Sequence, residues 1–264
     1  MKIGLFQFAC CDNTESNYLT MFRAIKKAKE NNVRLLLFPE CALTGYPPIE
    51  ISSVKQIDFI LVNKLIEKLY ADCIANEISI VFGSVFKLNG EISNRMVFID
   101  YKKEKVEYYS KRALWGWDKE NYTSGNKLGV FEIDNYKFGI RICFEIRFPE
   151  YFRELFKEKV DFTVIAFSDT CDKPYQTRYD LIKSHILTRA VENAFTVLTT
   201  NSISFFQTAP TCVVSPDGDI LLEAKQNEEE LIIYDYNPSE INFGRRGRLE
   251  VSEKLTSAST YLIW

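Results

Sequence analysis

The sequence predicts an α/β fold in which mixed β-sheets are covered by helices. Segments with the apolar spacing of helices alternate with short apolar runs that are typical of strands, and some strands follow one another as in hairpins. Hydrophobic residues make up 46% of the 264 residues, which is sufficient for a substantial core and argues against disorder. At this length one large domain is favoured over two, and we assign residues 1–264 to it.

The first half of the chain contains two expected helices and most of the expected strands. One helix is expected at 15–31, where Leu19, Phe22 and Ile25 recur at helical spacing, and the other at 55–76. The expected strands lie at 2–9, 33–38, 78–86, 95–101, 105–110, 128–133 and 137–143, with a loop at 111–127. The close spacing of the later strands predicts hairpin pairs.

The second half begins with a helix after Pro149, because proline suits the first turn of a helix. The remaining elements are expected at 161–167 (strand), 179–193 (helix), 195–201 (strand), 219–224 (strand) and 231–235 (strand). From about residue 238 we expect an irregular tail. Its Gly-Arg-Arg-Gly-Arg segment at 244–248 is interpreted as a loop or interface rather than a phosphate or nucleic-acid site, because the chain is acidic overall.

The charge and hydropathy patterns exclude several classes of partner. The net charge is −3, which gives no general attraction for nucleic acid or anionic membrane. No apolar run approaches the roughly 20 residues of a membrane-spanning helix. Residues 1–9 are patterned as a strand rather than as a signal peptide. We therefore expect a cytoplasmic protein that acts on a small molecule, with no nucleic-acid or membrane partner.

The cysteine pattern argues against disulfides and metal. The chain has seven cysteines, an odd number, and no C-x-x-C pair, so neither a disulfide framework nor a zinc site is expected. Most of them are expected to be small buried hydrophobic residues. They are Cys10, Cys11, Cys41, Cys73, Cys143, Cys171 and Cys212.

Cys143 differs from the others in its position. It ends the expected strand at 137–143, and Pro149 opens a helix soon after. Amides at such a turn can stabilise a thiolate, which makes Cys143 a candidate nucleophile. The usual base is missing, because the only histidine, His185, is expected in mid-helix as a packed or partly exposed residue. A Cys–His peptidase would have to use His185, and nothing in the sequence brings the two residues together.

Three expected strands end in groups of complementary chemistry, namely Glu40, Lys111 and Cys143. Ligands of α/β proteins bind beyond the carboxyl ends of strands, so these groups meet if their strands are parallel neighbours. Glu40 can serve as the base if burial raises its pKa, and Lys111 can stabilise the oxyanion formed when the thiol attacks a carbonyl or nitrile. The same carboxylate can then protonate a leaving amine and activate water against a thioester.

With these residues the chain resembles the nitrilase, or carbon–nitrogen hydrolase, superfamily over nearly its whole length. The resemblance rests on an ordered set of motifs: Phe38-Pro-Glu40 with Leu43-Thr-Gly-Tyr46, Lys111 before Leu114, Cys143-Phe-Glu-Ile-Arg-Phe-Pro-Glu150, and Arg189-Ala-Val-Glu-Asn193 with Asn201. It implies a four-layer α-β-β-α sandwich with two mixed β-sheets, and a homodimer paired sheet to sheet or a higher homo-oligomer. It also implies Glu40 as base, Lys111 as oxyanion stabiliser and Cys143 as nucleophile, with no metal or organic cofactor.

The chain departs from the family pattern in the loop after Lys111. Family members often have a histidine two residues after the lysine, where this chain has Ala113. A second active-site glutamate commonly lies seven residues before the loop glycine. Counting back from Gly125 reaches Asp118, which is one methylene shorter, with Glu120 as a nearby substitute. We therefore include Asp118 among the candidate catalytic residues and keep Glu120 as the alternative.

Several residues near these groups are candidates for contact with substrate. The tryptophans of the Lys111 loop can shape an acyl pocket or a dimer contact, or can simply pack the loop. Asp169 can bind a cationic group or cap the end of its strand, and amides near Phe144 are expected to help to hold the oxyanion. The candidate substrate-binding residues are Tyr46, Trp115, Trp117, Phe144, Phe148, Ser168 and Asp169.

The function predicted from these features is hydrolysis of a non-peptide carbon–nitrogen bond in a small amide or N-carbamoyl substrate. The reaction would pass through a thioester acyl-enzyme and release ammonia or an amine. The alternatives are nitrile hydrolysis, glutaminase-type ammonia supply, and a non-enzymatic relative that acts by binding partners. Ala113 and Asp118 are the best support for the last alternative.

Overall fold

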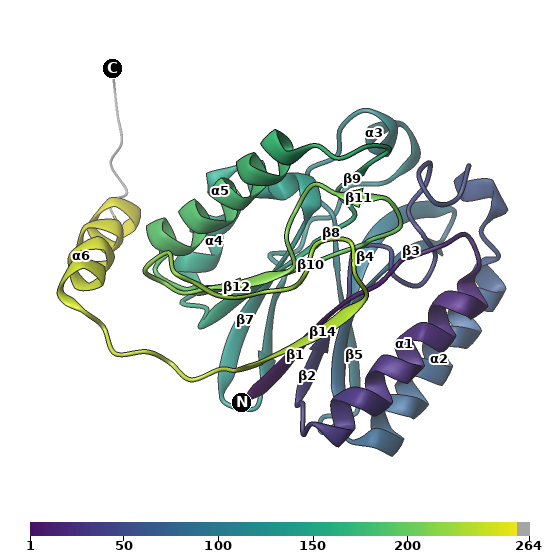
Figure 1. Cartoon of the computed structure of the whole chain (residues 1–264), viewed down its shortest axis with the longest axis horizontal. Coiled ribbons are helices and arrows are strands. Elements are labelled where there is room, and N and C mark those ends of the chain that lie inside the picture. Colours follow the sequence, from purple (N-terminus) through teal and green to yellow (C-terminus); the bar gives the residue numbers. More distant parts are fainter. Residues whose placement is uncertain (258–264) are drawn as a thin grey trace.

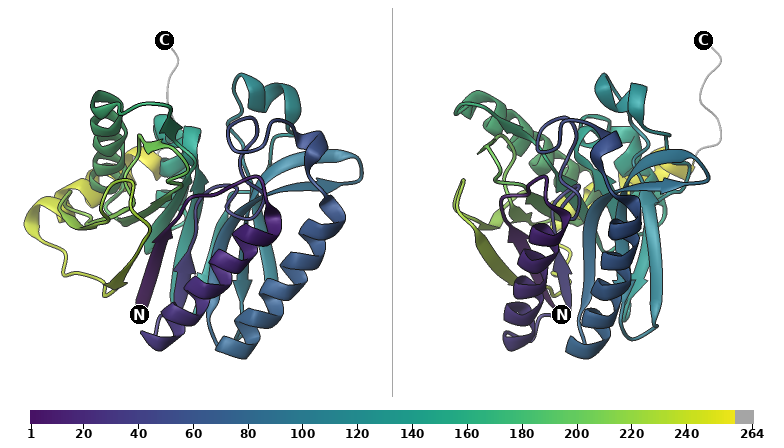
Figure 2. Two further views of the ribbon diagram at one scale, coloured as in Figure 1. Left: turned by 45° about the vertical axis from the view of Figure 1, so that its right-hand side comes forward. Right: turned by 90° about the vertical axis from the view of Figure 1, so that its right-hand side faces the viewer.

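Two six-stranded β-sheets face each other in the computed structural model, which describes residues 1–257 (Figure 1). Helices α1 (Thr14–Glu30) and α2 (Phe59–Asn76) cover the outer face of one sheet. Helices α4 (Pro149–Lys157) and α5 (Gln176–Asn193) cover the outer face of the other (Figure 2). This order of layers confirms the predicted four-layer α-β-β-α sandwich.

The first sheet has the strand order β14-β1-β2-β3-β4-β5. Its strands are β1 (Lys2–Gln7), β2 (Leu35–Leu37), β3 (Ser79–Leu88), β4 (Glu91–Asp100), β5 (Lys105–Ser110) and β14 (Glu230–Asp235). β1, β2 and β3 are parallel, whereas β4 runs the opposite way and β5 reverses again. β5 therefore points in the same direction as β2, and the two strands end at the same edge of the sheet.

The second sheet has the strand order β13-β12-β10-β8-β7-β6. Its strands are β6 (Val130–Ile133), β7 (Tyr136–Ile142), β8 (Phe162–Phe167), β10 (Thr196–Asn201), β12 (Cys212–Val214) and β13 (Ile220–Glu223). β7, β8 and β10 are parallel, so they end at one edge. A small third sheet pairs β9 (Thr170–Cys171) with β11 (Phe206–Gln207).

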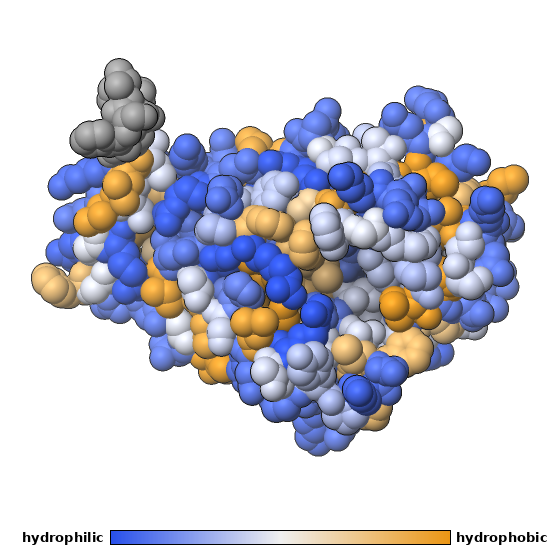
Figure 3. Space-filling model, turned by 90° about the horizontal axis from the view of Figure 1, so that it is seen from above, coloured by the Kyte–Doolittle hydropathy of each residue, from blue (hydrophilic) through white to orange (hydrophobic). Residues whose placement is uncertain are grey.

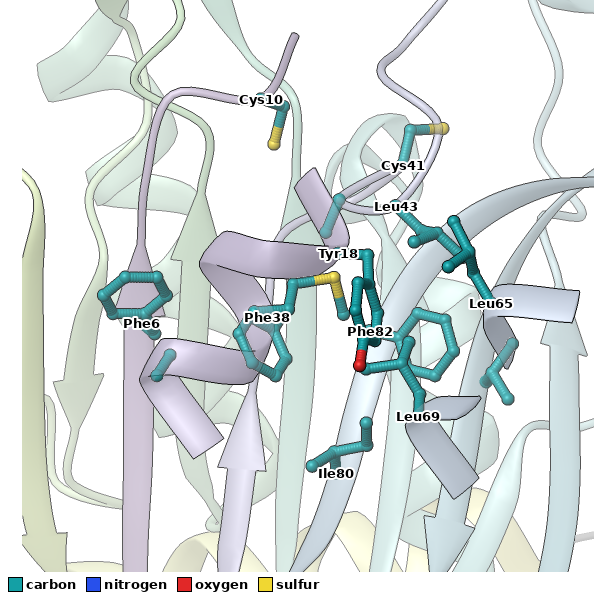
Figure 4. Close-up of a cluster of buried hydrophobic side chains, with 14 of the residues drawn as sticks. Phe6, Cys10, Tyr18, Phe38, Cys41, Leu43, Leu65, Leu69, Ile80 and Phe82 are labelled. Atoms are coloured by element: carbon teal, nitrogen blue, oxygen red, sulfur yellow. The ribbon is translucent and has the colours of Figure 1, made fainter. Parts of the chain in front are cut away.

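Strand β2 shows how a continuous apolar run supports two cores at once. Leu35 and Leu37 point toward the second sheet, whereas Leu36 and Phe38 point toward α1 and α2, because successive side chains of a strand face opposite sides. Figure 4 shows Phe38 within the outer core, surrounded by apolar side chains from the helices and the first sheet. Because both faces of β2 are buried, its sequence does not alternate between apolar and polar residues.

The core between the sheets is built largely from aromatic rings. Phe138 of β7 stacks on Phe162 of β8 with 5.3 Å between ring centroids, and it meets Phe98 of β4 edge to face at 5.1 Å. All three side chains are fully or almost fully buried. This core joins the two sheets whose strand ends carry the candidate catalytic residues.

Most predicted elements are confirmed to within a few residues, and β5 has the predicted bounds. Elements that the sequence did not predict are η1 (Val54–Gln56), α3 (Trp117–Asn121), η2 (Cys143–Arg147), β9, β11, β12 and α6 (Phe243–Ser257). The expectation of an irregular tail from about residue 238 is therefore wrong where α6 forms. The end of that tail, 258–264, lies outside the described residues.

Two of the three arginines of segment 244–248 bind their own chain. Arg245 is buried and donates to the carbonyl oxygen of Glu240, while Arg248 pairs with Asp217 at 2.7 Å. The segment thus forms the first turns of α6 rather than the predicted loop. Among the described helices, none combines the length and apolarity needed to cross a membrane.

Candidate active site

Strands β2, β5 and β7 end at one edge of the molecule, the upper edge in Figure 1, and Glu40, Lys111 and Cys143 follow these strand ends in the sequence. The condition under which they were expected to meet, that their strands are parallel neighbours, does not hold. β2 and β5 belong to the first sheet and are separated by β3 and β4, whereas β7 belongs to the second sheet. The three residues gather because the sheets are stacked with these ends on the same side. Figure 3 looks onto this edge, where polar side chains surround smaller apolar patches.

A sharp turn presents the thiol of Cys143. Helix η2 follows β7 directly, and Cys143 has a φ of +42°, a conformation that is strained for a residue with a side chain and is frequent at functional sites. The buried carboxylate of Glu145 fixes this turn by accepting hydrogen bonds from the amides of Ile142 (2.8 Å) and Arg112 (2.7 Å). Glu145 thereby connects the Cys143 turn to the loop that begins after Lys111.

Glu40 is 1% exposed, and both of its carboxylate oxygens accept hydrogen bonds. Oε1 accepts from Asn94 Nδ2 (2.6 Å) and from Lys111 Nζ (2.9 Å), and Oε2 accepts from the amide of Ser168 (3.0 Å). Asn94 was not among the predicted site residues, because the strand was expected to begin one residue later. A polar residue on the buried face of β4 is the signal that would have identified it.

The ammonium of Lys111 lies between two carboxylates. Besides Glu40, it contacts Asp118, with 2.7 Å between Nζ and Oδ2. The hydroxyl of Tyr46 donates to the other oxygen of Asp118 at 2.5 Å. Asp118 is buried in α3, whereas Glu120 on the same helix is exposed. The structure therefore brings Asp118 rather than Glu120 to Lys111.

Burial dominates the electrostatics of this cluster. It raises the pKa of the Glu40 carboxyl, and the ammonium of Lys111 acts in the opposite direction. Burial disfavours the charged form of Lys111 as well, but nearby groups, with Glu40 foremost, raise the pKa of Lys111 well above its usual range. Burial and then the charge of Glu40 raise the pKa of the Cys143 thiol far above its usual range. The thiol is therefore neutral at rest and needs a base before it can attack.

The amide of Ser168 faces both the thiol and the carboxylate. It donates to Glu40 Oε2, and its hydrogen bond toward Cys143 lowers the pKa of the thiol slightly against the stronger effect of burial. The hydroxyl of Ser168 is buried and has no hydrogen-bond partner among the described residues. A polar group is thus left free beside the candidate nucleophile.

Asp169, a predicted contact for a cationic substrate group, is already paired within the chain. Its Oδ1 lies 2.8 Å from Nε of Arg178, and its Oδ2 lies 2.9 Å from Nη2 of the same guanidinium. The hydroxyl of Thr208 also donates to Oδ1. The side chain of Asn201 holds the backbone of Asp169 through its amide and its carbonyl. Arg178 belongs to no motif, and sequence reasoning missed it.

The remaining aromatic candidates lie around the charged cluster at different depths. The Lys111 ammonium lies 5.6 Å from the centroid of the Tyr46 ring. Phe144 and Phe148 pack edge to face, with 5.2 Å between their ring centroids. Trp117 packs on Tyr122, and Trp115 is 73% exposed. Of these aromatic side chains, Tyr46 alone makes a hydrogen bond to the cluster within the part of the chain that the structure describes.

Other candidate features lie apart from this cluster. His185 sits in the middle of α5, where burial lowers its pKa, and no hydrogen bond links it to Cys143 within residues 1–257. No group of three or more metal-binding side chains occurs among the described residues. A cavity of about 690 Å³ lies between α4 and α6 and the end of α5. None of the candidate catalytic residues lines it.

The sequence matches the family model described as carbon–nitrogen hydrolase over residues 2–246. Among curated relatives, it is 28% identical over 210 residues to 2-oxoglutaramate amidase from Bacillus subtilis (strain 168), covering 77% of each chain. It is 29% identical over 161 residues to nitrilase homolog 2 from Dictyostelium discoideum, covering 56% of this chain and 48% of that protein. The chain therefore spans about half the length of the second relative.

Solved structures share the fold. An amidase mutant from Nesterenkonia sp. AN1, with acrylamide added at its active-site cysteine, superimposes with a TM-score of 0.80 at 22% identity, covering 97% of this chain and 99% of that chain. Glutamine-dependent NAD+ synthetase from Acinetobacter baumannii gives a TM-score of 0.73 at 24% identity, covering 88% of this chain and 44% of that one. These similarities support the four-layer architecture described above.

Proposed function

The chain belongs to the carbon–nitrogen hydrolase family, and on that premise we propose that it is a cysteine-dependent amidase that hydrolyses a non-peptide carbon–nitrogen bond. The substrate is a small amide or N-carbamoyl compound. The observation that carries this proposal is the buried set of Glu40, Lys111 and Asp118 beside the strained turn of Cys143. An amide is favoured over a nitrile because three curated relatives carry amidase names, namely 2-oxoglutaramate amidase, (R)-stereoselective amidase and deaminated glutathione amidase.

The first half of the proposed reaction forms a thioester. Glu40 takes the proton from the neutral thiol of Cys143, and the thiolate sulfur adds to the carbonyl carbon of the substrate. The Lys111 ammonium and backbone amides at the Cys143 turn stabilise the oxygen that becomes negative. Glu40 then gives its proton to the nitrogen, the carbon–nitrogen bond breaks, and ammonia or an amine leaves.

The second half releases the acid. Glu40, again a carboxylate, takes a proton from water, and the resulting hydroxide adds to the thioester carbonyl carbon. The carbon–sulfur bond breaks, the sulfur recovers its proton from Glu40, and a carboxylic acid departs. Asp118 acts as a positioning residue throughout, because it contacts the same Lys111 ammonium as Glu40 does.

Replacement of Cys143 by alanine is the direct test. We expect ammonia release from a panel of small amides and N-carbamoyl compounds to fall by more than about 10³-fold, since no other group can form the acyl-enzyme. Cys11→Ala is the matched control, because Cys11 is also partly exposed and lies outside the cluster. Its activity should stay within about twofold of the parent.

A second measurement separates an enzyme from a protein that only binds partners. Iodoacetamide in slight excess should alkylate Cys143 before the other six cysteines, with the modified peptide identified by mass spectrometry. Loss of activity should follow the extent of alkylation. Appreciable amidase activity in Cys143→Ala, or turnover of nitriles but not of amides, would refute the amidase proposal.

A further inference from the structure

A cavity with a charged lining lies on the opposite face of strand β4 from the candidate active site. It measures about 330 Å³, and residues 123–127 form one of its walls. Successive side chains of a strand face opposite sides, so Arg95 points away from the face on which Asn94 contacts Glu40. Arg95 shares its face with Val97, which packs in the outer core with side chains of α1 and α2. The cavity therefore belongs to the outer face of the first sheet.

Two cations of this cavity lie over one aromatic ring. The guanidinium carbon of Arg95 is 4.4 Å from the centroid of the Tyr108 ring, and Nζ of Lys127 is 3.9 Å from the same centroid. Tyr108 belongs to β5, the edge strand of the first sheet. Neither cation forms an ion pair with a carboxylate within residues 1–257. Because like charges repel, an anion beside both of them would stabilise the arrangement.

Arg95 keeps most of its hydrogen-bond donors. A guanidinium has five N–H groups, and the one at Nε donates to the hydroxyl of Ser93 at 2.7 Å. The N–H groups at Nη1 and Nη2 have no hydrogen-bond partner in the described part of the chain. A guanidinium that lies over a ring still presents its N–H groups at its edge, where they fit the oxygens of an anion.

The electrostatics of Arg95 reflect the lack of a carboxylate at close range. Burial lowers the pKa of its guanidinium from the usual value, and the weaker effects of Tyr108 and Glu91 act in the opposite direction. Arg112, which is also only partly exposed, contacts Glu154 at 2.6 Å, and this hydrogen bond raises the pKa of Arg112. A bound anion would supply for Arg95 the partner that Arg112 has within the chain.

Hydroxyl groups complete the lining. Ser93 is 4% exposed, and its oxygen accepts from Arg95, so its proton remains available for another acceptor. Ser110 lies directly opposite Arg95 in the pairing of β4 with β5, which places its side chain on the same face. Arginine, lysine and serine side chains are the groups that contact phosphate oxygens in proteins.

The wall of the cavity is bonded to the backbone of Lys111. The carbonyl of Lys111 accepts from the amide of Gly125 at 2.9 Å, and its amide donates to the carbonyl of Asn94 at 2.9 Å. A Cβ at Gly125 would lie 2.2 Å from the carbonyl oxygen of Ser110, so the wall and the end of β5 are in close contact. An anion in the cavity would therefore bind to the segment that also holds the backbone of Lys111.

We propose that Arg95, Lys127 and the hydroxyls of Ser93 and Ser110 form a binding site for a phosphate group, which free phosphate or a phosphomonoester can supply. This site goes beyond the proposed function and does not depend on it. A phosphate group carries about −1.5 to −2 charges at neutral pH and offers three strong acceptor oxygens. It matches two cations and two hydroxyls better than a carboxylate, which has one charge and two oxygens.

Glu91 is the acidic residue among the described residues of the lining, and it is exposed at the start of β4. It precedes Arg95 by four residues, which is about 13 Å along a strand, so it weakens the binding of an anion without preventing it. Glu91→Gln should therefore tighten phosphate binding about two- to threefold, because a like charge is removed. A variant that merely disturbed the fold would not bind more tightly.

Calorimetric titration of the full chain with inorganic phosphate, at constant ionic strength, measures the affinity. Arg95→Met should weaken binding about 10- to 100-fold, because charge-assisted hydrogen bonds are lost. Lys127→Met should weaken it at least about threefold, and this substitution of an exposed residue leaves the fold intact. Lys26→Met is the matched control, because Nζ of Lys26 also lies over a ring, 4.4 Å from the centroid of Phe22 on α1. Its affinity should equal that of the parent.

Other anions define what the site selects. Acetate should bind at least about tenfold more weakly than phosphate. Tighter binding of methyl phosphate than of free phosphate assigns the site to a phosphomonoester, and equal or weaker binding assigns it to the free ion. Equal affinities for acetate and phosphate, or unchanged binding in both Arg95→Met and Lys127→Met, would overturn the proposal. Cys143→Ala should bind phosphate as the parent does, so a failure of the amidase function leaves this site unaffected.

Hydrogen exchange locates the bound anion. Saturating phosphate should slow the exchange of the amides at 123–127 in the parent and not in Arg95→Met, because the anion holds this wall against the sheet. The exchange of α1, which does not line the cavity, should be the same with and without phosphate. Slower exchange elsewhere in the chain, with none at 123–127, would show that phosphate binds at a different place and that the proposal is wrong.

Discussion

At the residue scale, the site consists of one ammonium shared by two carboxylates beside a neutral thiol. Lys111 contacts Glu40 at 2.9 Å and Asp118 at 2.7 Å, and all three side chains are almost fully buried. Buried charges are costly unless they are paired, so neither carboxylate can be removed without a penalty to the ammonium. Burial is the main cause of the raised pKa of Glu40, and the negative charge of nearby Asp118 raises that pKa as well, because a like charge disfavours the ionised carboxylate.

This coupling predicts a shift in the pH profile of Asp118→Asn. Removal of the negative charge lowers the pKa of Glu40, so the base becomes deprotonated at a lower pH. The acidic limb of kcat/KM should therefore move to lower pH, while kcat falls about 10- to 100-fold because Lys111 is held less firmly. The profile is measured by ammonia release from about pH 4 to about pH 9.

The control for that experiment is Glu120→Gln, which removes an exposed carboxylate from the same helix. Its profile should coincide with that of the parent, since an exposed charge is screened by solvent. An acidic limb that stays in place, or that moves to higher pH, in Asp118→Asn would show that Asp118 does not influence the base.

Sequence patterns predicted some of these residues and not others, for physical reasons. Glu40, Lys111 and Cys143 end expected strands and belong to ordered motifs, so the sequence was sufficient to name them as candidates. The choice of Asp118 over Glu120 depends on which side of a single helical turn faces Lys111. Arg178 was missed because its contact with Asp169, nine residues away, is encoded by no local pattern.

At the element scale, close backbone approach positions the segment after β2. The amide of Gly83, in β3, donates to the carbonyl of Pro39, and a Cβ at Gly83 would lie 2.2 Å from the amide nitrogen of Cys41 and 2.6 Å from Cα of Glu40. No side chain fits in that space. The segment that carries Glu40, the proposed base, is therefore held by a contact between two backbones.

Gly83→Ala should consequently disturb both stability and catalysis. The added methyl group forces the Glu40 segment away from β3, which we expect to lower the free energy of unfolding by about 1–3 kcal/mol. The activity that remains at a temperature well below the midpoint should fall as well, since Glu40 moves relative to Lys111. Unfolding in urea followed by circular dichroism, together with ammonia release, measures both effects.

Gly247→Ala provides the comparison, because a Cβ at that position of α6 meets no atom within 4 Å. Alanine is the better helix former, so this variant should be as stable as the parent or up to about 1 kcal/mol more stable, with unchanged activity. If Gly83→Ala behaved in the same way, the tight approach between β3 and the Glu40 segment would not be what positions the base.

The elements that the sequence predicted are those in which apolar side chains recur in a clear pattern. Strand β5 and the buried run of β2 have clear patterns and were found. Helix α6 was missed because it contains Gly244 and Gly247 and has a single buried residue, Arg245, so no apolar stripe marks it. β12 is only three residues long, too short for a period to be recognised.

At the scale of the whole molecule, the site is assembled across the boundary between the sheets. The amide of Glu40 donates to the carbonyl of Phe167 at 3.2 Å, and the hydroxyl of Thr200 donates to the carbonyl of Phe38 at 2.9 Å. Both contacts join β2 or its end to strands of the second sheet. Periodicity marks strands but not the sheet they join, which is why the sequence could give parallel neighbours only as a condition and did not show that the strands belong to facing sheets.

A matched pair of core substitutions tests whether the spacing of the sheets controls catalysis. Leu5 of β1 lies between the sheets, whereas Leu69 of α2 packs between the helices and the first sheet, and both are fully buried. Replacement of either by alanine should lower the free energy of unfolding by about 2–5 kcal/mol. At temperatures where both variants remain folded, Leu5→Ala should lose more kcat than Leu69→Ala, because only the cavity left by Leu5 lets Glu40 and Lys111 shift relative to Cys143.

Urea unfolding establishes that the two losses of stability are comparable, and steady-state ammonia release then compares kcat. Equal kcat values at equal stability would mean that the hydrogen bonds across the strand ends, and not the core between the sheets, fix the distance between base and nucleophile.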